Sequence, residues 1–120
     1  MDVIAAQLRT SFNARDMDTF RSLIAENARW GDDPDHPRTC SSRDDIIRTY
    51  KRRMAEGVRG VVVETTTGPR GVACLVEFES PDPESGGPRP IYQVFLVTEG
   101  LITKIEGRDS EGMAIAAISG

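Results

Sequence analysis

The residues with the clearest potential for chemistry gather in one stretch, residues 27–46. It holds the only tryptophan, the only histidine and one of the two cysteines, which are Trp30, His36 and Cys40. Five of the ten aspartates also lie there, at positions 32, 33, 35, 44 and 45. Carboxylates and imidazoles are common general acids and bases of enzymes. A catalytic site in this chain is therefore expected to draw on this stretch.

The histidine and the cysteines each have a plainer interpretation. His36 lies in a segment with two prolines, and a side chain in such a loop is more often exposed than catalytic. No histidine is placed to activate Cys40 or Cys74, so both are expected to be small buried side chains rather than nucleophiles. One histidine and two distant cysteines form no metal motif, and no metal is expected.

Length and charge narrow the class of protein. The chain has 120 residues, which suits a single domain over residues 1–120, and a net charge of −4 with both signs interspersed. No basic patch is interleaved with aromatic residues, so nucleic acid is not an expected partner. No apolar run could span a membrane and the N-terminus lacks the apolar core of a signal peptide. We therefore expect a cytoplasmic protein with reduced thiols.

The first half of the chain has helical patterning. Ile4, Leu8 and Phe12 form an apolar stripe that predicts a helix over residues 2–14. Asp16 suits the N-cap of a second helix, which is expected to end near residue 26 and to be followed by a short strand-like link, residues 28–31. Ser42 suits the N-cap of a third helix, which buries Ile46, Ile47, Tyr50 and Met54 and stops at Gly57.

The second half changes to β patterning. Runs at residues 61–67, 72–79, 91–98 and 101–106 are rich in β-formers and have strand length. Residues 80–90 hold four prolines and predict a long hairpin loop, whereas Glu99-Gly100 predicts a tight turn. Residues 110–118 predict a short terminal helix.

Helices followed by an antiparallel sheet predict an α+β fold in which the helices cover one sheet face. Both faces of the sheet are largely apolar, because Phe95 and Val97 share one face of their strand while Val94 and Leu96 share the other. The simplest cover for the outer face is a second copy of the chain, so we expect a homodimer through that face.

Four segments, in this order and spacing, resemble the nuclear transport factor 2-like superfamily and its SnoaL-like group. They are residues 12–18, 23–30, 40–46 and 97–102. The resemblance implies a strongly curved sheet wrapped around the helices, a cone with an apolar pocket at its open end. Members of the superfamily include ketosteroid isomerases, polyketide cyclases and binding domains without chemistry, so the fold alone does not fix the function.

The resemblance also implies candidate catalytic residues. Residues 25–32 resemble the ketosteroid isomerase segment that ends in its general base, and Asp32 matches that base. An isomerase tyrosine falls near Thr10, which is no phenol, and an isomerase strand aspartate falls at Gln93, whose amide can donate a hydrogen bond. The alternative for Asp32 is a solvated turn aspartate before Pro34. For Gln93 it is an amide that satisfies a polar neighbour.

Two hypotheses follow for the function. The first is an enzyme that acts without a cofactor on a small hydrophobic carbonyl compound, with Asp32 as base and Gln93 as donor. The second is a non-catalytic ligand-binding or dimerisation domain that keeps the cone. In both, the pocket is expected to be lined by Phe12, Trp30, Tyr50, Val76, Phe78 and Phe95. Arg43, at the start of the third helix, is expected to form a structural ion pair.

Overall fold

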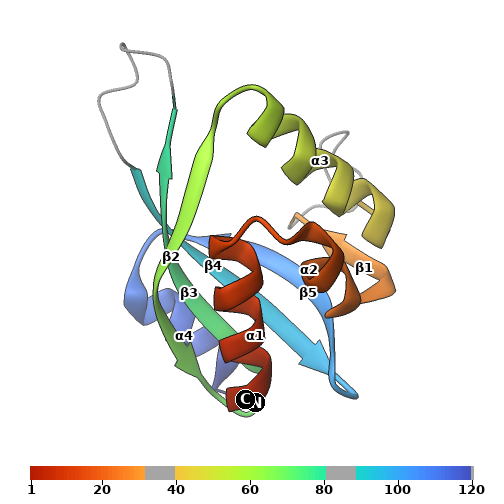
Figure 1. Cartoon of the computed structure of the whole chain (residues 1–120). Helices are drawn as coiled ribbons and strands as arrows, with labels where there is room; N and C mark the ends of the chain where they lie inside the picture. The colour runs from red at the N-terminus through yellow and green to blue at the C-terminus, as the bar shows by residue number, and fades with distance from the viewer. Residues whose placement is uncertain (32–39, 81–88, 120) are drawn as a thin grey trace.

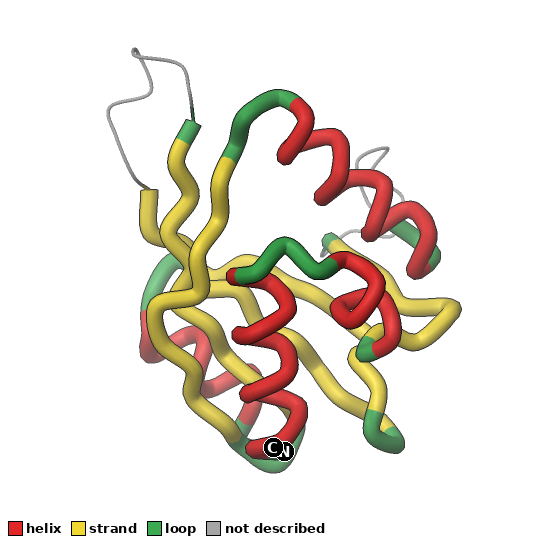
Figure 2. The backbone as a smooth tube through the Cα atoms, in the orientation of Figure 1, coloured by secondary structure: helices red, strands yellow, loops and turns green. Residues whose placement is uncertain are grey.

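The structure is a computed structural model, and it describes residues 1–31, 40–80 and 89–119. These residues form four helices and five strands, and Figures 1 and 2 show their arrangement. In order they are α1 (Asp2–Asn13), α2 (Met17–Ser22), β1 (Ile24–Trp30), α3 (Arg43–Ala55), β2 (Arg59–Thr67), β3 (Gly71–Glu79), β4 (Arg89–Thr98), β5 (Leu101–Arg108) and α4 (Glu111–Ile118). The predicted α+β class is confirmed.

The five strands form one open, strongly bent sheet in the order β1-β5-β4-β3-β2. The pairs β2–β3, β3–β4 and β4–β5 are antiparallel, but β1 joins β5 in parallel. The four predicted strands are antiparallel, as expected, but the sheet gains a parallel edge strand, β1, where only a short strand-like link was predicted. Cys40 forms an isolated antiparallel bridge with Trp30 at the end of this edge strand.

Two helix starts follow from single side chains. The carboxylate of Asp16 accepts a hydrogen bond from the Thr19 backbone at 3.2 Å and begins α2. The Ser42 hydroxyl accepts from the Asp45 backbone at 3.2 Å and begins α3. Both N-caps were predicted, and each satisfies a backbone N–H that the helix itself leaves unpaired.

The boundary between α2 and β1 differs from the prediction. The helix ends at Ser22 rather than near residue 26, and Ile24 already belongs to β1. The Leu23 carbonyl accepts a hydrogen bond from the Ile102 backbone at 2.8 Å, so pairing with β5 draws this segment into the sheet. The predicted strand-like link is thus the end of a seven-residue strand.

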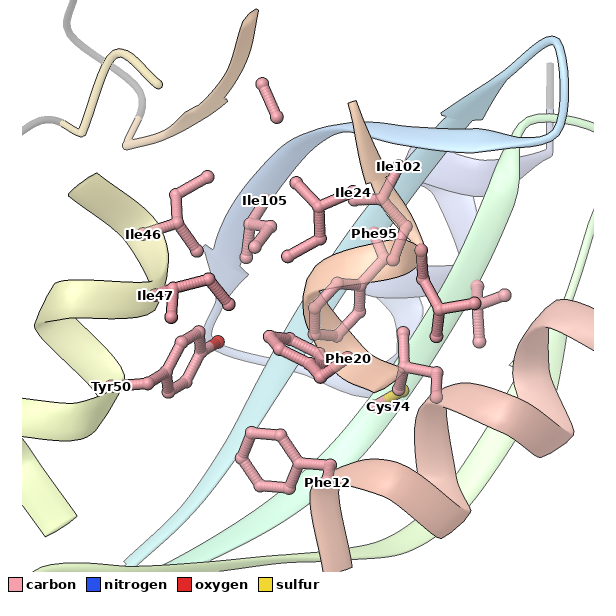
Figure 3. Packing of buried hydrophobic residues seen from close by; sticks show 14 of the residues in the cluster. Phe12, Phe20, Ile24, Ile46, Ile47, Tyr50, Cys74, Phe95, Ile102 and Ile105 are labelled. Carbon is pink, nitrogen blue, oxygen red and sulfur yellow. The ribbon is translucent and has the colours of Figure 1, made fainter. Parts of the chain in front are cut away.

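The main core lies between the inner face of the sheet and helices α1, α2 and α3. Figure 3 shows its centre, where Phe20 from α2 meets Phe95 from β4 and isoleucines from β1, α3 and β5. Phe20 and Phe95 are fully buried, and their rings meet edge to face. Burial of such rings is a main source of stability in a domain of this size.

A second, smaller core lies on the outer face of the sheet, beneath α4. Ala114 and Ile118 of the helix pack against Ala73 and Val94 of the sheet, with Tyr92 and Leu96 beside them. The chain therefore covers part of its own outer face. Cover by a second copy is not needed for these residues, and it stays a proposal for the surface around them.

Candidate functional site

Gln93 is a polar side chain within the apolar inner face of the sheet. It lies in the middle of β4, opposite Cys74 on β3 and Gly107 on β5, and is only 5% exposed. Its oxygen Oε1 accepts a hydrogen bond from the Tyr50 hydroxyl at 3.3 Å. Within the part of the chain that the structure describes, its nitrogen Nε2 donates no hydrogen bond to a protein group. The amide N–H groups are thus available to a ligand oxygen.

Tyr50 is held in place by aromatic neighbours on several elements. It stacks on Trp30 of β1, with ring centroids 4.6 Å apart, and meets Phe12 and Phe20 edge to face. Figure 3 shows its hydroxyl pointing from α3 into the core. Burial raises the pKa of Tyr50 above its usual range, so the phenol stays protonated and donates to Gln93.

Gly107, opposite Gln93 on β5, has no described atom close to it on its Cβ side. A Cβ atom added at Gly107 would meet no described atom within 4 Å. Gly31, the last residue described before the gap, donates its backbone N–H to the Ile105 carbonyl at 3.2 Å. The chain therefore leaves β1 beside this part of β5. Asp32 and His36 themselves lie outside the described residues.

An apolar pocket opens where the end of α1, the end of α3 and the start of β2 meet. Its volume is about 20 Å³, which is room for about one water molecule. The lining residues are Phe12, Arg15, Met17, Tyr50, Arg53, Met54, Val58, Gly60 and Phe78.

The residues expected to line the pocket separate into three groups. Phe12, Tyr50 and Phe78 lie along this pocket, and Trp30 stacks on the far side of Tyr50. Val76 and Phe95 are fully buried in the core and do not line it, because helices α1 and α2 cover this part of the sheet.

Several lining residues were not foreseen from the sequence. Arg53 and Met54 follow Tyr50 by three and four positions, so helical spacing alone places them beside it. Arg15 lies between two helices, where no periodicity gives a direction. Gly60 keeps the space open, because a Cβ atom there would lie 2.8 Å from the Phe78 ring.

The cysteines and Arg43 take structural positions. Both cysteines are free and buried, and burial raises the pKa of the Cys74 thiol to about 12, which opposes a thiolate. The Cys40 sulfur lies 3.4 Å from the Thr49 hydroxyl. Arg43 forms no ion pair with any described residue, so its expected salt bridge is absent there; its Nε atom is buried without a hydrogen-bond partner in the same part of the chain.

Two features are absent from residues 1–31, 40–80 and 89–119. These residues contain no group of three or more His, Cys, Asp or Glu side chains placed to hold a metal ion. They also contain no helix that is long and apolar enough to cross a membrane.

A curved sheet around three helices, with an apolar pocket at one end, defines the cone-shaped α+β class. The model of the SnoaL-like domain matches residues 5–105, and the chain belongs to this family, as the sequence motifs predicted. None of the curated proteins matches the chain in sequence.

Solved structures of other proteins share the fold at low sequence identity. Bal32a, from a soil-derived mobile gene cassette, has a TM-score of 0.74 and 17% identity, over 99% of this chain and 95% of its own. A protein from Sinorhizobium meliloti, named as a candidate polyketide cyclase, has a TM-score of 0.68 and 17% identity, over 88% and 93%. A protein from Kribbella flavida, named as a candidate ketosteroid isomerase, has a TM-score of 0.68 and 19% identity, over 90% of this chain and 77% of its own.

Proposed function

We propose that this protein is a cofactor-independent enzyme that removes a proton next to the carbonyl of a small hydrophobic compound. The observation that carries the proposal is the Gln93 amide. It lies in an apolar wall, its oxygen is occupied by Tyr50, and its N–H groups have no acceptor among the described residues. A donor fixed in this way suits the oxygen of a carbonyl, on which negative charge develops during enolisation.

The chemistry assigns one role to each of three residues. Asp32 takes the proton from the carbon beside the carbonyl, and the electron pair of that C–H bond moves to form the enolate. Gln93 donates to the enolate oxygen, and Tyr50 positions the Gln93 amide. Asp32 then returns the proton to the same or another carbon, which gives exchange or isomerisation. Named relatives of the fold include candidate cyclases and isomerases, which supports chemistry of this class.

A second candidate function is ligand binding without catalysis. The observation that favours it is the filling of the cone: Phe12, Phe20, Tyr50 and Phe95 occupy the centre, and the described pocket has only about 20 Å³. A bulky ligand would have to displace side chains or remain at the mouth. The two candidates make opposite predictions for proton exchange.

The test is hydrogen–deuterium exchange at the α-carbon of 2-tetralone, a hydrophobic bicyclic ketone, followed by proton NMR in D₂O. We expect Asp32→Asn to lower the enzyme-dependent rate by about 10²-fold or more, as for loss of a general base. Gln93→Met, which keeps the shape without donors, should lower it by about 10-fold to 10²-fold. Asp33→Asn, the neighbouring carboxylate, is the matched control and should exchange at the wild-type rate.

The outcomes separate the candidates. Exchange by Asp32→Asn at the wild-type rate would end the catalytic proposal. Binding of the ketone by the wild type, seen as a change in Trp30 fluorescence, without any exchange would support the second candidate.

A further inference from the structure

We infer that the pocket at the ends of α1 and α3 binds an amphiphile with a carboxylate group. The apolar part of the ligand would lie on Phe12, Tyr50 and Phe78, and its carboxylate would bind Arg15 and Arg53 at the rim. The inference deepens the proposed function, on which it rests, because Tyr50 belongs to both sites. It adds the charge of the ligand, which neither the fold nor the Gln93 site specifies.

The floor of the pocket is apolar and partly ordered by aromatic contacts. Phe12, Met17 and Tyr50 are buried, and the Phe12 and Tyr50 rings meet at right angles 5.6 Å apart. Phe78, Met54 and Val58 are half-buried and complete the wall. Such a surface favours an alkyl chain or a ring over a polar molecule.

The rim carries two arginines, Arg15 and Arg53, that have no acidic partner among the described residues. Both are exposed, and neither forms an ion pair with any residue in the described ranges. Other arginines are paired: Arg21 with Asp44, and Arg48 with Asp45. Asp16, the carboxylate next in sequence to Arg15, is engaged with both the backbone and the hydroxyl of Thr19. Two guanidinium groups that are unpaired within the described ranges and lie beside an apolar surface complement a carboxylate with an apolar tail.

Arg53 lines the pocket, and its guanidinium also contacts Trp30, the aromatic neighbour of Tyr50. Its guanidinium carbon lies over the Trp30 ring, 5.7 Å from the ring centre, and Trp30 stacks on Tyr50. A guanidinium that contacts an aromatic face still has N–H groups free to bind a carboxylate. Trp30 is the only tryptophan, so its fluorescence reports directly on a ligand that reaches Arg53.

Arg15 occupies a backbone position that suits glycine better. Its φ of 56° lies in the left-handed region, where it ends α1: its N–H bonds to the Phe12 carbonyl and the next N–H to the Ser11 carbonyl. Glycine or asparagine is the usual residue at such a helix end. Arg15 therefore carries a modest backbone strain that glycine would avoid, while its side chain lines the pocket.

The present volume is small, but two walls of the pocket can adapt. Met17 and Met54 are unbranched side chains, which repack with little strain around a ligand. An alkyl chain is narrower than a fused ring system, and it can enter from the exposed rim. We therefore choose straight-chain probes for the test.

The experiment titrates the full chain with decanoate, 2-decanone and decyltrimethylammonium and follows Trp30 fluorescence, with calorimetry as a second readout. The three probes have similar chains and differ in charge. We expect decanoate to bind at least about tenfold more tightly than 2-decanone, with decyltrimethylammonium weakest, and expect high salt to reduce the preference for decanoate. Equal affinity for decanoate and 2-decanone would overturn the inference.

Variants locate the site. Arg53→Gln and Arg15→Gly should each weaken decanoate binding about threefold to tenfold and leave 2-decanone binding nearly unchanged. Arg52→Gln removes an adjacent exposed arginine that does not line the pocket, and it should bind as the wild type does. Arg15→Gly should also unfold at the same or a higher denaturant concentration, so weaker binding cannot be attributed to lost stability.

Failure of this inference differs from failure of the proposed function. Tight decanoate binding that depends on Arg15 and Arg53, without proton exchange from 2-tetralone, supports the anionic site and contradicts the catalytic proposal. Proton exchange that depends on Asp32, together with no preference for decanoate, supports the catalytic proposal and contradicts the anionic site. If Arg53→Gln and Arg52→Gln weaken decanoate equally, the attraction comes from general positive charge and the pocket assignment is wrong.

Discussion

Two buried residues of the main core, Tyr50 on α3 and Cys74 on β3, make the stability of the protein depend on alkaline pH. Both flank Gln93, Tyr50 through its hydrogen bond and Cys74 through the strand register. Burial raises the pKa of each group, for Cys74 from 9.0 to about 12 and for Tyr50 above its ordinary 10.0. The folded state therefore holds these protons at a pH where the unfolded chain releases them.

The sign of the pH effect follows from that difference. The stability that the neutral groups contribute is fully present below pH 9 and is lost as the pH rises, first through Cys74 and from about pH 10 also through Tyr50. Each group should lower the free energy of unfolding by about 1.4 kcal/mol per pH unit within its window. Urea unfolding between pH 8 and 11 measures this slope.

Variants assign the slope to residues. Cys74→Ala should remove most of the loss between pH 9 and 10, and Tyr50→Phe should reduce the loss above pH 10. At pH 7, Tyr50→Phe should cost only about 0.5–1.5 kcal/mol, the usual net contribution of one hydrogen bond. An unchanged slope in the double variant would show that these groups are not the cause.

For single residues, the sequence indicates which residues belong to a site better than it indicates where their side chains point. Gln93 was identified through the resemblance to ketosteroid isomerase, and Tyr50 through its place on the core stripe of the third helix. Arg15 was not, because the direction of a side chain between two helices depends on the left-handed backbone that ends α1.

At the scale of elements, local side-chain chemistry explains where helices begin, and tertiary pairing explains where the prediction failed. Asp16 and Ser42 cap helices by contacts within three residues, so the sequence alone is sufficient there. Ile24 extends the apolar run of α2 and is equally compatible with a strand. Only the parallel pairing with Ile102, far along the chain, decides the outcome.

The strands offer a matched pair of glycines for a test. A Cβ atom at Gly71, at the start of β3, would lie 2.1 Å from the Phe95 carbonyl oxygen, so the backbones of β3 and β4 approach too closely for a side chain. Gly71→Ala is therefore expected to lower the free energy of unfolding by about 2–3 kcal/mol. Gly107→Ala, where no described atom lies within 4 Å, should change it by less than about 1 kcal/mol.

Urea denaturation of the two variants at pH 7 measures the difference. Equal stability of Gly71→Ala and Gly107→Ala would contradict the close approach of β3 and β4. Gly107→Ala has a second use, because Gly107 lies opposite Gln93. Retained exchange of 2-tetralone in this variant would show that the space beside Gln93 tolerates a methyl group.

At the scale of the whole molecule, the terminal helix changes the expectation for assembly. The apolar outer face was predicted from strand alternation, but its partial cover by α4 was not. The helix is apolar on most of its surface, so its sequence shows no side that must face the sheet. The place where α4 packs on the sheet follows from the turn between β5 and α4. The hydrophobic periodicity of the helix sequence does not predict the direction of that turn.

The outward side of α4 is itself apolar. Met113 is 52% exposed and Ile115 is 37% exposed, and Ile115 adjoins Leu75 and Tyr92 of the sheet. We propose that a second copy of the chain covers this surface, so the predicted dimer forms through α4 together with the outer sheet. A two-fold contact would place the same apolar residues of both copies together.

Sedimentation velocity at micromolar concentration tests this arrangement. We expect a dimer for the wild type and a monomer for the double variant Met113→Lys, Ile115→Lys, because two buried lysines per copy would lose their hydration without partners. Val3→Lys changes a more exposed aliphatic residue, 69% exposed, on α1 at the other side of the sheet, and it should remain dimeric. A wild-type monomer would show that α4 covers the outer face without a second copy. A dimer in all three proteins would show that the interface lies on another surface.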